Sequence, residues 1–178
     1  MQVNQLAARD VALVAEIDRT EHVDVEYRVI DGELQPVAAT IPEVPPWDPI
    51  GSGPHSVSVH IAFCESVVAR GGILLGAFDE DRTAGLAIVE PLFEPRLAWL
   101  ASLHVSRPFR RRGAAQALWN AAADIAVASG AGSMYVSATP TESAVGFYLK
   151  QGCRLARPVH PDLFAAEPDD IHFVCSLR

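Results

Sequence analysis

The chain has 178 residues, enough for one ordinary domain with a hydrophobic core of its own. Hydrophobic residues make up 49% and charged residues 20% of it, which is typical of a folded domain and excludes a disordered segment. The 22 acidic and 14 basic residues give a net charge of −8, which argues against a nucleic-acid partner or an anionic membrane surface. We expect a single domain over 1–178.

The charge is distributed unevenly along the chain. Residues 1–90 contain fifteen acidic and five basic side chains, whereas residues 91–178 contain seven acidic and nine basic ones. Five arginines and no acid lie between Arg96 and Arg112. This asymmetry predicts that an anion binds the C-terminal half and a cation the N-terminal half. Acidic loops that only keep the protein soluble are the alternative for the N-terminal half.

Cysteine usage and the N-terminus bear on the compartment. Cys64, Cys153 and Cys175 are odd in number and widely spaced, and they indicate neither a disulfide framework nor a zinc site, which favours a reducing compartment. We interpret each as a small buried hydrophobe. No apolar run approaches the roughly 20 residues of a membrane span, and the first residues do not resemble a signal peptide. We therefore expect a cytoplasmic protein without a membrane partner.

The first residues predict a mixture of strands and helices. Met1–Leu6 is typical of a short strand, and apolar residues at helical spacing predict a helix over Asp10–Arg19. Val23–Val37 alternates between apolar and polar residues around the turn dipeptide Asp31-Gly32. This pattern predicts a β-hairpin.

A proline-rich stretch separates this hairpin from the next predicted helix. Pro42–Pro54 contains five prolines, so we expect a loop without regular structure, and long loops in compact domains are often functional. Ser56–Arg70 carries apolar residues at helical spacing and is followed by Gly71-Gly72. We expect a helix that ends at these glycines.

Strand patterns dominate the next segment. Ile73–Phe78, Ala84–Val89 and Leu97–Val105 are separated by short polar or proline-containing turns, which predicts an antiparallel three-stranded meander. An amphipathic helix follows and ends near Gly130, and Met134–Ala138 is typical of another strand.

The connection from the meander to this helix concentrates positive charge. Pro108 ends the strand, and we expect Gly113 in the first turn of the helix, where the missing side chain lets a ligand approach the backbone. The first N–H groups of a helix have no partner within it, and the helix dipole adds positive charge there. Together with Arg110–Arg112, this turn is suited to phosphate. A solvated basic run and a nucleic-acid-binding surface are the alternatives, although Phe109 is the only aromatic residue within the run.

These residues carry a family resemblance. The strand end Leu103–Ser106 and the turn Arg110–Ala115 resemble the acyl-CoA-binding motif Q/R-x-x-G-x-G/A of the GNAT N-acetyltransferase superfamily. Thr141–Gly152 is similar to the second motif of that family, N-x-x-A-x-x-F-Y-x-x-x-G, and departs from it at Thr141, where the family has Asn. A threonine hydroxyl can still cap the helix that begins there. The resemblance covers roughly residues 73–155.

The resemblance implies a fold class and separate roles for two parts of the chain. It implies an α/β fold of the α+β type, with a mixed, mostly antiparallel central sheet flanked by helices and with splayed central strands. Within a single N-acetyltransferase domain, 73–178 would form the acyl-CoA-binding core and 1–72 the acceptor side. Acetyl-CoA would be the cosubstrate, and no metal would be needed.

The resemblance also implies how the cofactor is held. Backbone groups of Leu103 and Val105 would bind the pantetheine amides as an added strand would, and a backbone N–H near Val105 would polarise the thioester carbonyl. The pyrophosphate would lie on the N–H groups of the arginine–glycine turn. The expected cofactor-binding residues are Leu103, His104, Val105, Arg110, Arg111, Arg112, Gly113, Ala114, Ala115, Thr141, Ala144 and Tyr148.

The implied chemistry is direct attack of a neutral amine on the thioester, so the cysteines need no catalytic role. Tyr148 stands at the family's tyrosine position, where its phenol would donate a proton or a hydrogen bond to the leaving thiolate. An alkylammonium has a pKa of about 10, so a base must remove its proton. Glu90 and His104 are the leading candidates for that base, and Glu26 and Glu65 are weaker ones.

The first 72 residues would decide what is acetylated. We expect their acidic side chains, Glu26 among them, to attract a cationic amine, and Trp47 to cover it as an aromatic lid, with a packed loop anchor as the alternative for Trp47. The expected acceptor is a small amine, such as an aminoglycoside- or streptothricin-like antibiotic, an amino acid or a polyamine. A protein N-terminus or lysine, and an acyl-CoA-responsive module without turnover, are the competing interpretations. Homodimers are common in the family.

Overall fold

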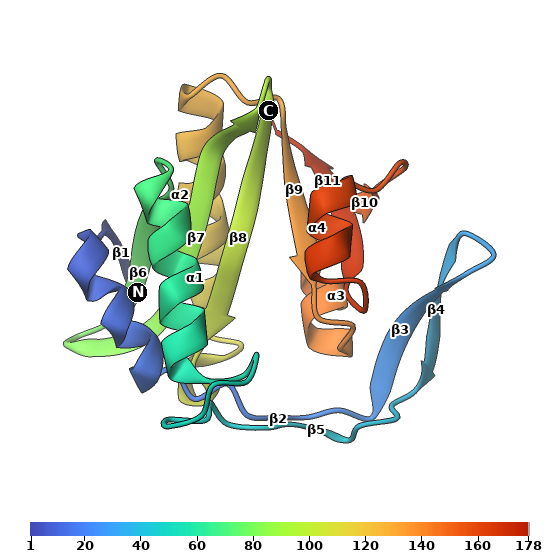
Figure 1. The fold of residues 1–178 in the computed structure, drawn as a ribbon, viewed down its shortest axis with the longest axis horizontal. Helices are drawn as coiled ribbons and strands as arrows, with labels where there is room; N and C mark the ends of the chain where they lie inside the picture. The colour runs from blue at the N-terminus through green and yellow to red at the C-terminus, as the bar shows by residue number, and fades with distance from the viewer. Residues whose placement is uncertain (178) are drawn as a thin grey trace.

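The computed structural model describes residues 1–177, which form a central sheet with helices on both of its faces and two small two-stranded sheets (Figure 1). The sheet has seven strands in the order β1-β6-β7-β8-β9-β11-β10, and β8 and β9 are its one parallel pair within the described residues. This arrangement confirms the predicted mixed, mostly antiparallel sheet.

The predicted N-terminal strand and the three-stranded meander are confirmed. The meander continues further than expected, because its second strand extends past Val89 as far as Glu94. The strands of the sheet are β1 (Gln2–Gln5), β6 (Ile73–Asp79), β7 (Arg82–Glu94), β8 (Leu97–Val105), β9 (Ser133–Ala138), β10 (Arg154–Leu155) and β11 (Ile171–Ser176).

Four α-helices cover the two faces of the sheet. The helices α2 (Ala114–Ala128) and α3 (Glu142–Lys150) share one face, and α1 (Val57–Ala69) and α4 (Pro161–Ala166) lie on the other (Figure 1). Both helices predicted before and after the meander are confirmed. No helix in the described part of the chain combines the length and the apolar character needed to cross a membrane.

The first helical segment differs from the prediction. A 3₁₀-helix, η1, spans Ala8–Glu16 in place of the expected α-helix over Asp10–Arg19. The buried side chains here are Val11, Val14 and Ile17, each 2% exposed and three residues apart. A spacing of three matches the three residues per turn of a 3₁₀-helix, so this geometry buries all three on one side.

The central strands separate after a short paired region. Residues Leu97–Leu100 of β8 pair with Ser133–Val136 of β9, and the ladder ends there. On its other side β8 carries a β-bulge, because Val89 pairs with Leu100 while its neighbour Ile88 pairs with Ser102. A bulge bends its strand and increases the local twist, so the remaining residues of β8 turn away from β9. Figure 1 shows the two strands diverging towards the end of β8, which confirms the splayed central strands.

The hairpin predicted within Val23–Val37 is confirmed. It consists of β3 (Val25–Ile30) and β4 (Glu33–Ala38), and both turn residues have positive φ, as a tight two-residue hairpin requires. The stretch predicted to lack regular structure contains one short strand, β5 (Glu43–Val44), which pairs with β2 (Glu21–His22).

The N-terminal segment spans the open end of the splay. Its Thr20 carbonyl accepts a hydrogen bond from Arg110, which follows β8, at 2.9 Å. Its Tyr27 N–H donates to the carbonyl of Pro140, which follows β9, at 2.7 Å. The chain between these two anchors, including β2, therefore bridges the mouth between the separated strands (Figure 1).

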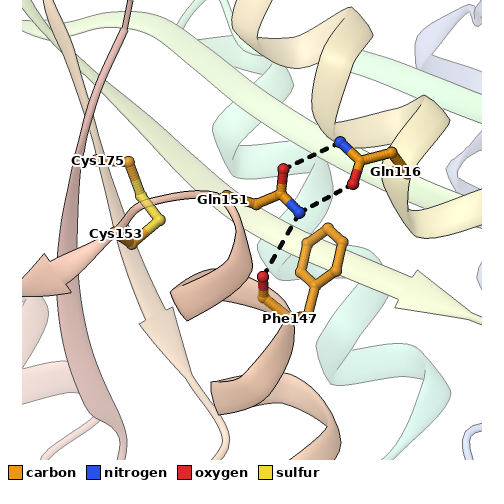
Figure 2. Close-up of a disulfide and its surroundings, with 5 residues drawn as sticks. All are labelled: Gln116, Phe147, Gln151, Cys153 and Cys175. Atoms are coloured by element: carbon orange, nitrogen blue, oxygen red, sulfur yellow. Dashed lines mark hydrogen bonds between the residues drawn. A yellow bond between two sulfur atoms is a disulfide. The ribbon is translucent and has the colours of Figure 1, made fainter.

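The prediction that the cysteines form no disulfide is wrong for one pair. Cys153, which follows α3, is joined to Cys175 of β11 (Figure 2). The antiparallel pairing of β10 with β11 brings these two residues together across 22 positions of sequence, and cysteine spacing does not reveal such a pairing. Cys64 is free. All three cysteines are buried, as expected of small hydrophobes.

Candidate active site

The turn before α2 presents an open stretch of backbone. Gly113 caps this helix with φ at +88°, and Arg111 also lies in the left-handed region with φ at +62°. A Cβ atom at Gly113 would meet no heavy atom within 4 Å, so the requirement for glycine here comes from the backbone conformation. The prediction put Gly113 in the first helical turn, and the structure puts it one position earlier, as the cap.

The first N–H groups of α2 are available to a ligand. Gly113 offers no capping side chain, and the first turn contains no acidic residue. Ala114 and Ala115 are the first two helical positions, whose N–H groups have no acceptor within a helix. With the helix dipole, these donors make a site for an anion such as phosphate.

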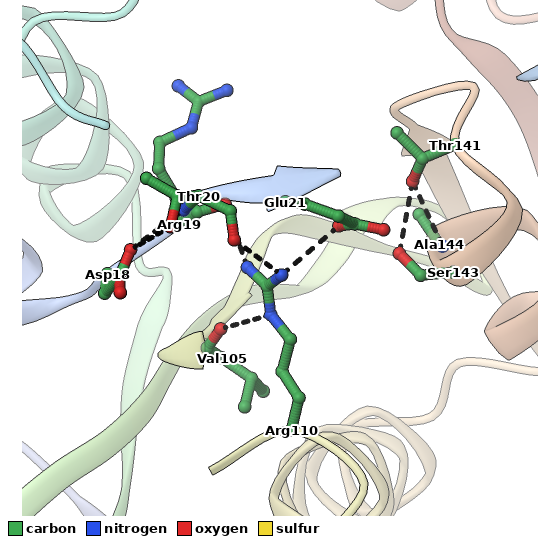
Figure 3. A network of polar contacts seen from close by, with 9 residues as sticks. All are labelled: Asp18, Arg19, Thr20, Glu21, Val105, Arg110, Thr141, Ser143 and Ala144. Carbon is green, nitrogen blue, oxygen red and sulfur yellow. Dashed lines mark hydrogen bonds and ion pairs between the residues drawn. The ribbon is translucent and has the colours of Figure 1, made fainter. Parts of the chain in front are cut away.

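The three arginines of the turn have different surroundings. Arg110 points away from the helix and donates to the carbonyls of Arg19 and Thr20 at 2.9 Å each and of Val105 at 3.2 Å (Figure 3). Arg112 forms an ion pair with Asp79 at 2.9 Å. Arg111 is exposed and has no hydrogen bond to any other residue in 1–177. The backbone of the turn, with Arg111 beside it, is therefore what remains open to a phosphate.

The end of β8 presents unpaired N–H groups to the splay. The Ser106 N–H donates to Ala84 on the β7 side at 2.9 Å. Because backbone groups of a strand alternate in direction, the N–H groups of Leu103 and Val105 face the opposite side, where β9 has moved away. The carbonyl of Val105 is occupied by Arg110, so donors predominate at this edge.

The helix α3 forms the other wall of the splay. Thr141 caps it by accepting a hydrogen bond from the Ala144 N–H at 3.3 Å, so the predicted capping role is present. Gln116 in the first turn of α2 and Gln151 at the end of α3 exchange two hydrogen bonds of 2.9 Å (Figure 2). The two helices that flank the turn are thus tied together.

Tyr148 is a residue of α3, and its ring faces α2. It is 7% exposed and packs on Trp119 of α2 and Phe173 of β11, with ring centroids 5.9 and 6.3 Å apart. Burial raises the pKa of its phenol, and the nearby carboxylate of Asp170 raises it further. The phenol therefore keeps its proton at neutral pH and can donate it.

The face of β8 that points towards α1, opposite to the face covered by α2 and α3, carries a cluster of aromatic rings. The ring centroid of Trp47 lies 4.7 Å from that of His60 on α1 and 5.2 Å from that of His104. The two imidazoles are 5.1 Å apart, and Ser102 Oγ lies 3.3 Å from His60 Nε2. We call Trp47, His60, Ser102 and His104 the front cluster. It brings together the predicted residues Trp47 and His104.

The imidazoles of the front cluster are neutral. Burial lowers the pKa of His60 to about 4 and that of His104 to about 3, and the positive charge of Arg19 adds to both effects. A cavity of about 10 Å³ lies beside both rings and Ser102, which is room for roughly one water molecule.

Two carboxylates lie near the end of β9. Asp170 directly precedes Ile171, which pairs with Ala138, the last residue of β9. Burial raises the pKa of Asp170 to about 7, with a contribution from the neighbouring Glu167, whose own pKa burial also raises. Neither carboxylate forms an ion pair with a side chain in residues 1–177.

The structure does not bring the other predicted acids to the front cluster. Glu90 pairs with Trp99 and forms an ion pair with Arg70 at 3.3 Å. Leu86, the partner of His104, lies four residues from Glu90 along β7, which corresponds to about 13 Å.

The remaining two acids also lie elsewhere. Glu26 is held by Arg28 at 2.7 Å and by the Thr40 N–H at 3.2 Å, and the hydrogen bond from Arg28 keeps its pKa below the usual range. Glu65 is an exposed residue of α1.

Sequence reasoning missed several residues of this region. Arg19, His60 and Ser102 lie in segments far apart in the sequence and carry no motif. Asp170 follows α4, an element that the sequence analysis did not predict. One signal was present for His60, because a polar ring in the otherwise apolar stretch 59–64 is unusual for a helix packed on a sheet.

Comparisons with known proteins bear on this geometry. No curated protein sequence matches the chain. Among solved structures, a nourseothricin acetyltransferase superposes with a TM-score of 0.73 at 18% identity, covering 99% of this chain and 98% of that one. A candidate streptothricin acetyltransferase from Bacillus anthracis str. Ames, in complex with acetyl coenzyme A, gives a TM-score of 0.63 at 14% identity, covering 97% and 94%.

A third solved structure extends the similarity. The PaiA N-acetyltransferase of Thermoplasma acidophilum, in complex with coenzyme A, gives a TM-score of 0.61 at 14% identity and covers 99% of both chains. At these identities the similarity establishes the fold. The family model described as the acetyltransferase (GNAT) family matches residues 43–153, which include β8, the arginine–glycine turn and α3. The chain is therefore a member of the GNAT acetyltransferase family.

Proposed function

We propose that this protein is an N-acetyltransferase that moves the acetyl group of acetyl-CoA to the amino group of a small molecule by direct attack. The observation that carries the proposal is the splay of β8 from β9, with unpaired N–H groups along one edge. At the end of this edge lies the start of α2, which has no capping side chain. A pantetheine arm fits the first feature and a pyrophosphate the second.

In this proposal the cofactor enters from the face of α2 and α3. Backbone N–H groups from Arg111 to Ala115 take the pyrophosphate, and those of Leu103 and Val105 take the pantetheine amides and the thioester oxygen. Ala144 lines the groove, and the Thr141 hydroxyl serves as a helix cap rather than as a cofactor ligand.

The reaction forms a C–N bond and breaks the C–S bond. The acceptor's ammonium group first releases one proton to solvent, and the resulting neutral amine adds to the thioester carbon. The tetrahedral intermediate collapses with loss of the CoA thiolate. Tyr148 donates its proton to this thiolate, whose conjugate acid has a pKa of about 8.5. The nitrogen loses one proton as it becomes an amide nitrogen, and that proton returns to the phenolate through solvent.

We propose His104 as the group that receives the amine's proton, with His60 as the next acceptor. Both rings are neutral, and a neutral imidazole has one nitrogen that can accept a proton, although the pKa values of these two are low. A weak base suffices at this stage, because nitrogen bonded to the forming carbonyl is far more acidic than the starting ammonium. Glu90 is disfavoured by its ion pair with Arg70 and its position in β7.

The acceptor approaches from the face of the front cluster. Trp47 supplies an aromatic wall there. Asp170 and Glu167 lie near the other side of the splay, and any ionised fraction of these two carboxyls attracts the ammonium form of the amine. The names of the nourseothricin and streptothricin relatives agree with a small amine as acceptor.

A panel experiment tests the proposal. The protein is incubated with acetyl-CoA and single amines from four classes: amino acids, polyamines, streptothricin-type antibiotics and a peptide with a free N-terminus and a lysine. Free thiol and product mass are measured, and the Gly113→Glu variant serves as the control for the cofactor site. Acetyl-CoA binding without thiol release by any amine would contradict the proposal and favour an acyl-CoA-responsive module. Acetylation of the peptide alone would identify a protein acetyltransferase instead.

A further inference from the structure

Arg19 differs from the other arginines around the splay because no carboxylate neutralises it. Arg110 and Arg112 are paired with acids, whereas no acidic side chain in residues 1–177 lies within 4.0 Å of the Arg19 guanidinium. Its one side-chain hydrogen bond partner is His55, with Arg19 Nη1 and His55 Nδ1 3.2 Å apart. The side chain is half-buried, and burial lowers its pKa. A half-buried cation without a counter-ion is unfavourable unless a ligand supplies the charge.

Trp47 adds an independent observation. Its indole Nε1 is buried and has no hydrogen bond partner, and it is the one buried side-chain polar atom in residues 1–177 in this condition. A buried donor without an acceptor is unfavourable, so such atoms are few in folded proteins and each calls for an explanation. The Arg19 guanidinium carbon lies 4.4 Å from the centroid of the Trp47 ring, so a cation without an acidic partner is stacked on a ring whose N–H has no acceptor.

These donors lie beside the strand that faces the thioester. Trp47 packs edge-on against His104, whose neighbours in β8 are Leu103 and Val105. The Arg19 carbonyl is itself bound by Arg110, which also binds the Val105 carbonyl. Figure 3 shows the Arg19 guanidinium pointing away from these backbone contacts. Arg19 and Trp47 thus lie beside His104 and the end of β8, the part of the strand to which the proposed function assigns the thioester.

We propose that Arg19 and Trp47 form a subsite for a carboxylate of the acceptor, so that the acceptor is an amine that also carries a carboxylate. This inference rests on the proposed N-acetyltransferase function and narrows its substrate class to the amino acids in the broad sense. The guanidinium pairs with the carboxylate, and the indole N–H donates to it.

The charge of the subsite selects a monoanion. Both imidazoles of the front cluster are neutral. The positive charges of Arg19 and Arg110 both act on His104, but Arg110 is paired with Glu21, whereas Arg19 has no acidic partner within residues 1–177. One guanidinium matches one carboxylate, whereas a phosphate dianion would leave a negative charge uncompensated next to buried rings. Burial raises the pKa of Asp170 to about 7, so near the end of β9 this group can accept a hydrogen bond or a proton from the acceptor's ammonium group, while Arg19 binds the carboxylate at the other end of the acceptor.

The test compares each amino acid with its amide. Glycine, 3-aminopropanoate, 4-aminobutanoate and 6-aminohexanoate, each with the corresponding primary amide, are offered to the wild type and to Arg19→Gln, and kcat/KM is measured. For each chain length, kcat/KM for the acid is divided by kcat/KM for the amide, and this acid-to-amide ratio of the wild type is divided by that of Arg19→Gln. The resulting double ratio does not depend on the intrinsic difference in amine reactivity between acid and amide. For the best chain length we expect this double ratio to be about 10 to 100, as for a charge-assisted hydrogen bond.

Three further variants separate recognition from folding. Arg9→Gln removes an exposed arginine, 87% exposed, from the same N-terminal segment and leaves the double ratio at about 1. Arg19→Lys keeps the charge and retains part of the preference, because lysine lacks the planar fork. Trp47→Phe keeps an aromatic ring and removes the N–H, and it lowers the acid-to-amide ratio by about fivefold with acetyl-CoA affinity unchanged.

The outcomes distinguish the inference from the function on which it rests. A double ratio near 1 for every chain length, with measurable acetylation of the amides, overturns the carboxylate subsite and leaves the acetyltransferase in place. An equal loss of kcat/KM on acids and on amides in Arg19→Gln also overturns the carboxylate subsite, because it shows that Arg19 has a structural role. Thiol release by none of these compounds or those of the amine panel, in protein that binds acetyl-CoA, overturns the proposed function and the inference with it.

Discussion

The two faces of the splayed sheet are built in different ways. On the face of α2 the candidate cofactor site consists of backbone N–H groups within one turn, Arg110–Ala115, and the last residues of β8. On the other face the candidate acceptor site consists of side chains from the N-terminal segment, the proline-rich loop, α1 and β8. The first site depends on local conformation, and the second on how distant segments pack.

This difference agrees with what each site has to recognise. A cofactor common to a family can be bound through backbone groups, which every sequence possesses, provided that one glycine and one strand end are in place. An acceptor that differs between family members has to be recognised by side chains. Mutations at the two sites should therefore have separable effects on acetyl-CoA binding and on acceptor use.

The largest expected effect is that of Gly113→Glu on acetyl-CoA affinity. Gly113 adopts φ of +88°, so any side chain introduces strain, and a carboxylate at the start of α2 repels the pyrophosphate. We expect the Kd to rise by about 1,000-fold, measured by calorimetry, with Gly113→Ala showing the strain alone at about tenfold. Unchanged affinity in a folded Gly113→Glu protein would refute the assignment of the turn.

The front cluster predicts a loss of stability in acid. Burial holds the pKa of His60 at about 4, below the 6.5 of an unfolded chain, so at low pH the unfolded state binds the proton more tightly. The contribution of the neutral His60 ring to stability is fully present above pH 6.5 and is lost as the pH decreases towards 4. This loss lowers the free energy of unfolding by about 3 kcal/mol. Denaturant unfolding of the wild type and of His60→Gln between pH 7 and 4 measures the difference. Parallel curves for the two proteins would show that His60 is not buried as a neutral ring.

Tyr148→Phe should affect turnover alone. The phenol is buried and its pKa is raised, so it is protonated at neutral pH, and the variant loses the proton donor while keeping the ring. We expect kcat to fall by about 100-fold with an unchanged Kd for acetyl-CoA. A variant with wild-type kcat across pH 6–9 would remove the proposed acid role.

The smallest effects separate two neighbouring arginines. Arg110 holds three carbonyls, at 2.9, 2.9 and 3.2 Å, so Arg110→Met should lower the free energy of unfolding by about 2 kcal/mol. Arg112 forms one largely exposed ion pair, and Arg112→Met should change it by less than about 0.5 kcal/mol. Chemical denaturation measures both variants. Equal losses would mean that Arg110 does not anchor the N-terminal segment to β8.

Local sequence patterns predicted those parts of the structure that depend only on residues close together in the sequence. Hydrophobic alternation identified β6, β7 and β8, and Asp31-Gly32 identified the hairpin turn. The arginine–glycine turn was recognisable because a phosphate site at a helix start needs only a few consecutive residues. The 3₁₀-helix η1 was mistaken for an α-helix, since Val11 and Val14 fit both periods over so short a segment.

The remaining features are matters of tertiary packing. The partner of Cys153, the neutrality of His60 and the uncompensated charge of Arg19 follow from contacts across 22 or more residues of sequence. The sequence by itself determined the class of fold, and it predicted a candidate backbone site for a phosphate-bearing cofactor, because both follow from short-range conformational preferences. Only the tertiary structure decided which side chains border the acceptor face, because burial and charge at that face depend on segments that no local pattern connects.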